Sequence, residues 1–367
     1  MLTMFRTRAV RPLIGLDIGV TGIRAAQVVR GDRGWRVREA TLFPRASATG
    51  ASAATSLTEG VRGCLRDGRF RGRGIAAGLN APEVEFQALE LPEDELVGSA
   101  EAIEGVVRGE ITRGAHDPGE ETEIRFWRLP KSSAHAPHVL GVAARREAVV
   151  ESVEACRLAG WECVRVDAAA LALARAGRVL LPAEEEEVWG VLDVSVRETR
   201  LVLCVGDTPL LVRAVGSGGE DWTKRITERL GVSEETAEIH KCEHGIPSIT
   251  REPRGERTPR PVRGVDSLVL GALRPDLTAI ASEIKRSYEY ALGCHPRGHA
   301  STLIVAGGGA QTRHLPEFFG QLLGIPVTTP SALLKEPACR LTYEATAHPL
   351  EVILLAVGLS IPGETPT

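Results

Sequence analysis

The chain has 367 residues, of which 43% are hydrophobic and 25% are charged, which is enough for two compact lobes that each bury a core. Lysine and arginine together number 44 against 48 aspartates and glutamates, so the formal net charge is −4. No global basic field is available to hold a nucleic acid, which makes nucleic-acid binding a poor first hypothesis.

The sequence carries no signal for crossing a membrane. The longest apolar stretch, around 350–361, is shorter than the roughly 18 residues that a spanning helix needs, and it contains Glu351. The first twelve residues include three arginines but no apolar segment of signal-peptide length. We therefore expect a cytoplasmic protein that inserts into no membrane by itself and reaches one only through a partner.

Cysteine usage predicts neither a disulfide framework nor a metal site. The seven cysteines are scattered without a CxxC pair, which is typical of reduced thiols. His240, Cys242 and His244 form one cluster in which the two histidines would share a helix face. Because Cys242 would point away from that face and no fourth ligand is evident, we expect no metal there.

Hydrophobic periodicity predicts a first unit that begins with a strand over 13–18 and a hairpin over 23–29 and 35–43. A helix ending near residue 65 and a buried strand over 74–79 complete this unit. A separate α/β stretch follows, with a helix over 95–111, strands over 124–129 and 139–144, and a helix over 147–158.

The opening pattern then recurs, with strands over 188–194, 200–205 and 209–215. Helices are predicted over 220–230, 233–244 and 270–292, and a strand over 301–306 precedes a helix over 315–323. Two units that open alike predict a duplication whose halves face each other across a ligand cleft. The alternative is two unrelated hairpins.

These patterns divide the chain into five parts: a first lobe over 1–91, an inserted subdomain over 92–166, a connecting helix and linker over 167–187, a second lobe over 188–346, and a C-terminal helix and tail over 347–367. Within the second lobe, residues 247–264 are rich in proline and arginine and poor in apolar side chains, which predicts a flexible surface loop. Either a solvated loop or a contact for an acidic partner or lipid headgroups fits this composition.

The first motif with chemical content is Asp17-Ile18-Gly19-Val20-Thr21-Gly22. It places a carboxylate at a strand end and then a turn whose glycines let backbone N–H groups approach phosphate oxygens. We expect Asp17 to hold Mg²⁺ through water, and Thr21 and Arg24 to meet the phosphates.

Two further glycine turns precede predicted helices. Gly307-Gly308-Gly309 follows a buried strand and suits an adenosine or an α-phosphate, although a close strand-to-helix packing turn would use the same residues. Gly218 and Gly219 likewise place free amides at a helix start. Glu238 and Lys241 then share a helix face, where they would bond a ribose and a base edge or form a simple surface ion pair.

The order of these motifs resembles that of the PilM family of type IV pilus assembly proteins, in the FtsA/PilM branch of the actin-like ATPase superfamily. The segments that carry the resemblance are GLDIGVTGIRAAQV at 15–28, GVLDVSVRETRLVLCVGDTPL at 190–210, SGGEDWTKRI at 217–226, ETAEIHK at 235–241 and LIVAGGGAQTRHLPEF at 303–318. Further segments at 91–96, 143–162 and 166–176 extend it over nearly the whole chain.

The resemblance implies an α/β protein with the actin-like ATPase fold, in which two RNase H-like lobes enclose ATP and Mg²⁺ and an α/β subdomain is inserted. It implies a cytoplasmic scaffold that docks a PilN-like N-terminal peptide of a bitopic inner-membrane protein, and so sits at the inner membrane through that partner, with self-association possible in principle. Carried over by position, the first phosphate motif comprises Asp17, Gly19, Thr21, Gly22 and Arg24, and the second contains Asp193. Asp17 and Asp193 are the candidate catalytic and magnesium residues. The resemblance assigns Gly218 and Gly219 to the nucleotide-side loop, Glu238 and Lys241 to the ribose, and Gly307, Gly308 and Gly309 to the adenosine.

The second phosphate motif departs from the family pattern. Ser195 stands where the family has glycine, and Glu198 follows where a small or hydroxylated residue is expected. A Cβ at Ser195 and a charge at Glu198 would hinder a γ-phosphate, so we expect at most a weak ATPase. Two other functions stay open as alternatives, a small-molecule (sugar-type) kinase of the same superfamily and an FtsA-like membrane-associated filament protein. The latter is expected to have a terminal amphipathic basic helix, which the polar tail PGETPT lacks.

Overall fold

The structure is a computed structural model that describes residues 12–32, 34–45, 51–91, 100–114, 121–130, 136–247, 264–344 and 348–363. Its first sheet has six strands in the order β14-β3-β2-β1-β4-β8. The strands are β1 (Ile14–Ile18), β2 (Gly22–Gly31), β3 (Gly34–Pro44), β4 (Gly74–Leu79), β8 (Glu162–Ala168) and β14 (Leu341–Thr342). Helices α1 (Ala51–Asp67) and α4 (Arg146–Leu158) cover one face of this sheet, over a core that includes Ile14, Leu16 and Leu65.

The second sheet has five strands in the order β11-β10-β9-β12-β13. They are β9 (Glu187–Val194), β10 (Glu198–Val205), β11 (Thr208–Ser217), β12 (His299–Ala306) and β13 (Val327–Thr328). Around them lie α6 (Gly219–Leu230), α7 (Glu234–Ile239), the π-helix η1 (His240–His244), α8 (Val265–Cys294), the 3₁₀-helix η2 (Gly308–Gln311), α9 (Leu315–Leu323) and α10 (Pro330–Leu333). Trp222 of α6 and Phe319 of α9 are fully buried against the outer face of this sheet.

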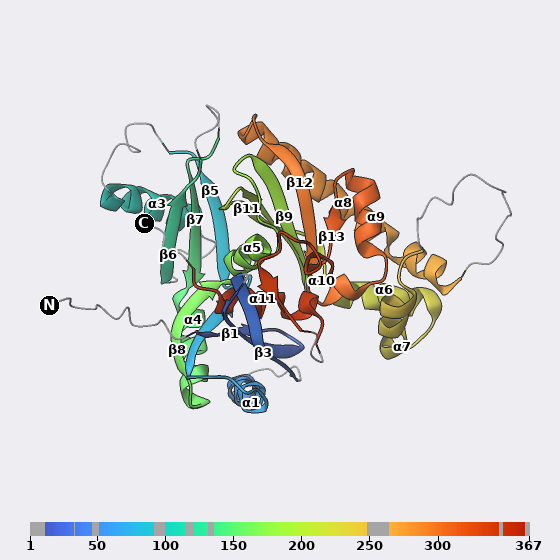
Figure 1. Cartoon of the computed structure of the whole chain (residues 1–367), viewed down its shortest axis with the longest axis horizontal. Helices are drawn as coiled ribbons and strands as arrows, with labels where there is room; N and C mark the ends of the chain where they lie inside the picture. Colours follow the sequence, from blue (N-terminus) through green and yellow to red (C-terminus); the bar gives the residue numbers. More distant parts are fainter. Residues whose placement is uncertain are drawn as a thin grey trace.

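Two helices lie between the two sheets. The apolar faces of α5 (Ala169–Leu180) and α11 (Leu350–Ser360) share one core with residues of both sheets, among them Val28 of the first and Val191 of the second. Figure 1 shows these helices at the centre of the molecule. Every residue of α11 except Val352 is buried, and apart from Glu351 and Ser360 its residues are apolar, as expected of a helix enclosed by protein.

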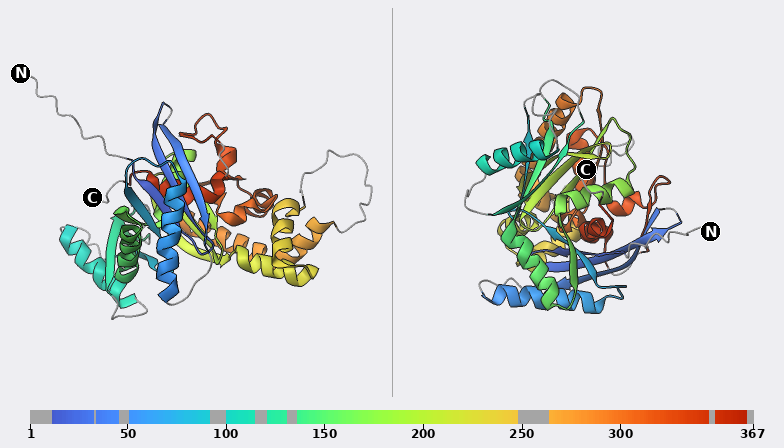
Figure 2. Two further views of the ribbon diagram at one scale, coloured as in Figure 1. Left: turned by 90° about the horizontal axis from the view of Figure 1, so that it is seen from below. Right: turned by 90° about the vertical axis from the view of Figure 1, so that its left-hand side faces the viewer.

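A third sheet, in the order β5-β7-β6, stands apart from the other two. It contains β5 (Val84–Leu89), β6 (Thr122–Arg128) and β7 (Val139–Arg145), with α3 (Ala100–Gly114) beside it. Figures 1 and 2 show this unit on the opposite side of the molecule from α6 and α7. Trp127 Nε1 donates a hydrogen bond to the carbonyl of Pro209 at 3.1 Å, which ties the unit to β11 of the second sheet.

The structure moves both boundaries of the inserted subdomain. The sequence-based boundary at 91/92 leaves β5 in the first lobe, but β5 pairs with β7, in a register that sets Val84 opposite Ala144. The boundary at 166 places most of β8 in the subdomain, whereas β8 pairs in parallel with β4 of the six-stranded sheet. Strand partners decide this assignment, and they are not visible in the period of a single segment.

Most predicted helices are present with shifted ends. The helix expected over 270–292 runs over Val265–Cys294 with Pro275 inside it, and the one expected over 233–244 is α7 followed by the π-helix. Residues 248–263 of the loop predicted over 247–264 lie outside the described residues, as do residues 95–99 of the helix predicted over 95–111. Among the described residues, no helix has the length and apolarity to span a bilayer.

Candidate functional site

The opening hairpins of the two larger sheets carry the same pair of charged residues in the same register. Asp17 near the end of β1 lies directly opposite Arg24 of β2, and Asp193 near the end of β9 lies directly opposite Arg200 of β10. In both hairpins the arginine follows the aspartate by seven residues. Directly opposed residues have Cβ atoms about 5 Å apart, so each hairpin sets an aspartate beside an arginine. Asp17 and Arg24 form an ion pair, whereas the guanidinium of Arg200 contacts Glu198 and Asn80.

The first pair sits on the predicted phosphate turn. Arg24 Nη1 is 3.2 Å from Asp17 Oδ2 and 3.4 Å from the Gly22 carbonyl oxygen. The amide of Gly19 donates to the Gly22 carbonyl at 3.0 Å, which closes the turn. A Cβ at Gly19 would lie 2.6 Å from Arg24 Nη1, so the glycine lets the guanidinium lie against the backbone. The backbone carbonyl of Thr21, in the same turn, accepts a hydrogen bond from the Arg45 amide at 2.9 Å.

The second pair is held by a larger set of side chains. Asp193 Oδ2 accepts a hydrogen bond from Ser195 Oγ at 2.8 Å. Arg200, which is 7% exposed, forms an ion pair with Glu198 and donates from Nη1 to Asn80 Oδ1 at 3.0 Å. Asn80 follows β4 of the first lobe, so Arg200 joins the two lobes. The charge of Glu198, which the sequence suggests would repel a phosphate, is paired with Arg200.

The two pairs lie close enough for the charge of Asp193 to act on Asp17. Burial raises the pKa of Asp17, Arg24 opposes that rise, and the neighbouring charge of Asp193 raises the pKa further. Burial also raises the pKa of Asp193, with Arg200 as the main opposing charge. Both residues are 6% exposed. Strongly perturbed, buried carboxyls at the junction of two lobes are a common mark of functional sites.

The glycine triplet borders this cluster. Gly307 has φ +84° and ψ 178°, a conformation open essentially to glycine alone, and a Cβ there would lie 2.6 Å from Asp193 Oδ1. Gly309 packs against Val194, whose Cγ1 would lie 2.2 Å from an added Cβ. Around Gly308 an added Cβ would meet nothing within 4 Å. The triplet therefore presents one open glycine beside Asp193.

The predicted ribose residues form a third group next to the Ser195 turn. The amide of Gly219, at the start of α6, donates to the Ser195 carbonyl at 2.8 Å, and a Cβ at Gly218 would lie 2.4 Å from the Val196 carbonyl oxygen. Lys241 is 2% exposed, and its Nζ is 3.2 Å from the Gly219 carbonyl and 2.5 Å from Glu238 Oε2.

A third acceptor completes the shell of Lys241. Its Nζ lies 2.8 Å from Thr223 Oγ1 on α6. The lysine belongs to the π-helix, whose extra residue per turn carries the side chain back onto α6. Glu238 and Lys241 therefore do meet as predicted, but the lysine is buried and is no simple surface partner.

Arg200 and Asn80 are site residues that the sequence patterns did not single out. Arg200 had a signal, because it repeats the Asp17 to Arg24 spacing from Asp193. Asn80 had none, since its partner lies 120 residues away.

His240 and His244 lie side by side on the π-helix, with ring centroids 5.2 Å apart. Within the described ranges, no three or more histidine, cysteine, aspartate or glutamate side chains are grouped to hold a metal. At the candidate site, Asp17 and Asp193 are two carboxyls with an arginine opposite each.

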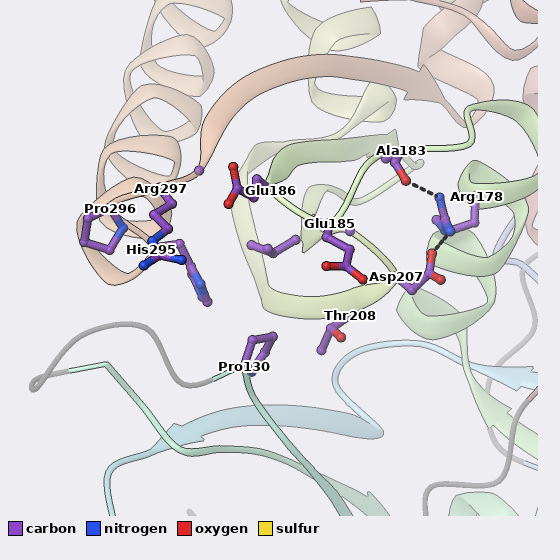
Figure 3. A pocket seen from close by; sticks show the side chains of 13 residues that line it. Pro130, Arg178, Ala183, Glu185, Glu186, Asp207, Thr208, His295, Pro296 and Arg297 are labelled. Atoms are coloured by element: carbon purple, nitrogen blue, oxygen red, sulfur yellow. Dashed lines mark hydrogen bonds and ion pairs between the residues drawn. The ribbon is translucent and has the colours of Figure 1, made fainter.

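A pocket of about 780 Å³ lies elsewhere, at the opposite end of β9 from Asp193. The linker before β9, the turn between β10 and β11, and the turn between α8 and β12 form its walls (Figure 3). Arg178 donates to the Ala183 carbonyl at 3.0 Å and pairs with Asp207 in this wall. Since none of the predicted nucleotide residues lines it, the paired aspartates and not this pocket define the candidate site.

Comparison with known proteins identifies the family and the fold of the chain. A family model described as "Type IV pilus assembly protein PilM" matches residues 15–253. A solved structure described as "PilM-PilN type IV pilus biogenesis complex" is 24% identical over 95% of this chain and 97% of that chain, with a TM-score of 0.71. The ethanolamine utilization protein EutJ from Carboxydothermus hydrogenoformans is 13% identical over 95% of this chain and 88% of that chain, with a TM-score of 0.52. With two lobes of the actin-like ATPase fold and a family match over well more than half of its length, the chain belongs to the PilM family of type IV pilus assembly proteins.

Proposed function

We propose that this protein is an ATP-binding scaffold of a type IV pilus or type II secretion-like assembly machine, and that it docks a PilN-like inner-membrane protein. The observation that carries the nucleotide part is the meeting of Asp17, Asp193 and Gly307 at the junction of two lobes. Three glycine turns border this place, and two arginines offer charge. Such a junction is the usual place for a ligand site.

The roles of the individual residues follow from their placement. Arg24 and the turn at Gly19 to Gly22 would meet the phosphates, because guanidinium and amide N–H groups are the donors that phosphate oxygens prefer. The open Gly308 would face the adenosine, and Glu238 is half-exposed beside the buried Lys241, where it would accept from a ribose hydroxyl. Magnesium at Asp17 and Asp193 stays a prediction from the sequence, and the donor set does not favour it, because each carboxyl already has an arginine opposite.

The scaffold part rests on the family and on a surface of the first lobe. The similar solved structure is a complex of PilM with PilN, and we assign a PilN-like peptide to this chain as its partner. Strand β8 is the outermost strand of its sheet, and Val164 on it is 55% exposed. Val150 and Val153 on the adjoining α4 are 58% and 40% exposed. An open strand edge beside apolar side chains suits an extended peptide, which would add a strand and place alternate side chains on these valines.

Nucleotide binding is tested by thermal unfolding with and without ATP, in buffers with magnesium and in buffers with EDTA. A ligand that binds only the folded state raises the unfolding midpoint, by an amount that grows with its concentration. Adenosine and GTP serve as comparison ligands. A midpoint that ATP leaves unchanged in both buffers would remove the nucleotide from the proposal.

Docking is tested with a fluorescent peptide of the N-terminal cytoplasmic residues of the PilN-like protein from the same organism. Val164→Lys is expected to weaken peptide binding at least about tenfold, since it places a charge where apolar contact is expected. Leu322→Lys is the matched control, because Leu322 is 44% exposed on α9 of the other lobe. Equal binding by both variants would contradict the surface, and no binding by the wild type would contradict the scaffold role.

A further inference from the structure

The hairpins β1–β2 and β9–β10 differ from a simple metal site because each carries an arginine opposite its aspartate. Asp17 faces Arg24 and Asp193 faces Arg200, in equivalent register positions of two hairpins. Arginine stays protonated at any pH that the folded protein meets. With Glu198, which pairs with Arg200, three carboxyl groups face two guanidiniums, so the arginines offset most of the negative charge at the centre of the site.

Arg200 cannot easily leave this arrangement. Its guanidinium pairs with Glu198 on its own strand and donates to Asn80 Oδ1 of the first lobe at 3.0 Å. Only 7% of the residue is exposed. Because two partners hold the planar guanidinium group, its remaining N–H groups keep fixed directions, which favours bidentate binding of an anionic group.

Arg24 has an unused donor in the same region. Its Nη1 serves Asp17 and the Gly22 carbonyl, whereas its buried Nε has no hydrogen-bond partner among the described residues. A buried N–H without an acceptor destabilises the fold. A phosphate oxygen on the adjacent turn would supply that acceptor.

A divalent cation meets the opposite situation. Two guanidiniums already offset two of the three carboxyl charges of the cluster, and Arg24 and Arg200 would repel the cation. In other phosphate sites the metal ion neutralises the charge of the phosphate oxygens, and here the arginines can do so.

We propose that Arg24 and Arg200 take the place of the divalent cation, so that this chain binds ATP that is not complexed with magnesium. The proposal rests on the proposed function, since it concerns the same site. It assigns to Arg200 a role in phosphate recognition, through its placement opposite Asp193 and its tie to Asn80.

The test is equilibrium binding of a fluorescent ATP analogue to the full chain, in magnesium and in EDTA. Affinity in EDTA is expected to equal or exceed that in magnesium. Arg200→Gln is expected to weaken binding in EDTA by at least about tenfold, the effect of losing one charge-assisted hydrogen bond. Arg297→Gln is the matched control, an exposed arginine in the turn between α8 and β12, and it is expected to bind as the wild type does.

Adenosine separates a phosphate contact from a damaged fold. Because adenosine has no phosphate, Arg200→Gln is expected to leave its affinity unchanged. If Arg200→Gln weakens the binding of ATP and of adenosine equally, the same two affinities are measured for Arg24→Gln. An equal loss of both affinities in Arg24→Gln overturns the proposal. Binding of ATP only in magnesium also overturns it while leaving the proposed nucleotide function intact, whereas absence of binding in both buffers refutes the proposed function itself.

Discussion

The glycine triplet gives the sharpest test of the site geometry, because its neighbouring positions predict opposite results. Gly307→Ala forces a Cβ to within 2.5 Å of the Val194 carbonyl oxygen and 2.6 Å of Asp193 Oδ1. It also places alanine at φ +84° and ψ 178°, which is destabilising by about 1–3 kcal/mol. The shifts of neighbouring atoms that relieve these close contacts cost about 1–3 kcal/mol more of unfolding free energy. We expect a total loss of about 2–6 kcal/mol of unfolding free energy.

Gly308→Ala is the matched control for stability and a test of the ligand. Its Cβ would meet nothing within 4 Å, and its backbone has no left-handed φ. Stability is expected to stay equal or to rise by about 0.4–1 kcal/mol, because alanine restricts the unfolded chain. The added methyl group lies where we expect adenosine, so ATP affinity is expected to fall.

The assays are urea unfolding followed by circular dichroism and thermal unfolding with and without ATP. The unfolding midpoint reports the loss in Gly307→Ala, and the ATP-dependent shift reports the ligand site in Gly308→Ala. Equal midpoints for the two variants would show that the triplet does not press against Asp193. An unchanged ATP shift in Gly308→Ala would show that the nucleotide base lies elsewhere.

Two other predictions follow from buried charges. Because burial raises the pKa of Asp193 above its ordinary value of 3.8, ionisation of this carboxyl lowers stability as the pH rises through the folded-state pKa. Asp193→Asn is therefore expected to unfold at a higher temperature than the wild type at pH 7, with the difference vanishing in acid below pH 3.8, and a lower midpoint at pH 7 would contradict this. Lys241→Met removes three hydrogen bonds from a 2% exposed ammonium group and is expected to lower the unfolding free energy by about 1–3 kcal/mol, measured by urea unfolding. Lys224→Met, which breaks only the exposed pair with Glu220, is the control, and an equal effect of both changes would refute the role of burial.

Several features were readable from local sequence because local physics decides them. A strand that ends in Asp17 and turns through Gly19 and Gly22 needs only the period of apolar residues and the freedom of glycine to be recognised. The repeat of that pattern at Asp193 and the glycine triplet after β12 were visible for the same reason. The family match over residues 15–253 confirms the family that these motifs predicted.

Other features depended on which strands pair. Strand β5 was assigned to the first lobe because its own residues do not reveal its partner, and its pairing with β7 places it in the inserted subdomain. The predicted helix over 233–244 changes into a π-helix at His240, where the burial of Lys241 against α6 overrides the regular turn.

The sequence by itself determined the strand and helix periods, the glycine turns and the two aspartates, since each depends on residues within a few positions of one another. Only the tertiary structure decided that Arg200 stands between the lobes, because its bond to Asn80 joins residues 120 positions apart. Long-range contacts of this kind arise from the packing of whole sheets on one another. They decide which groups of the two lobes meet at the site, which no single segment contains.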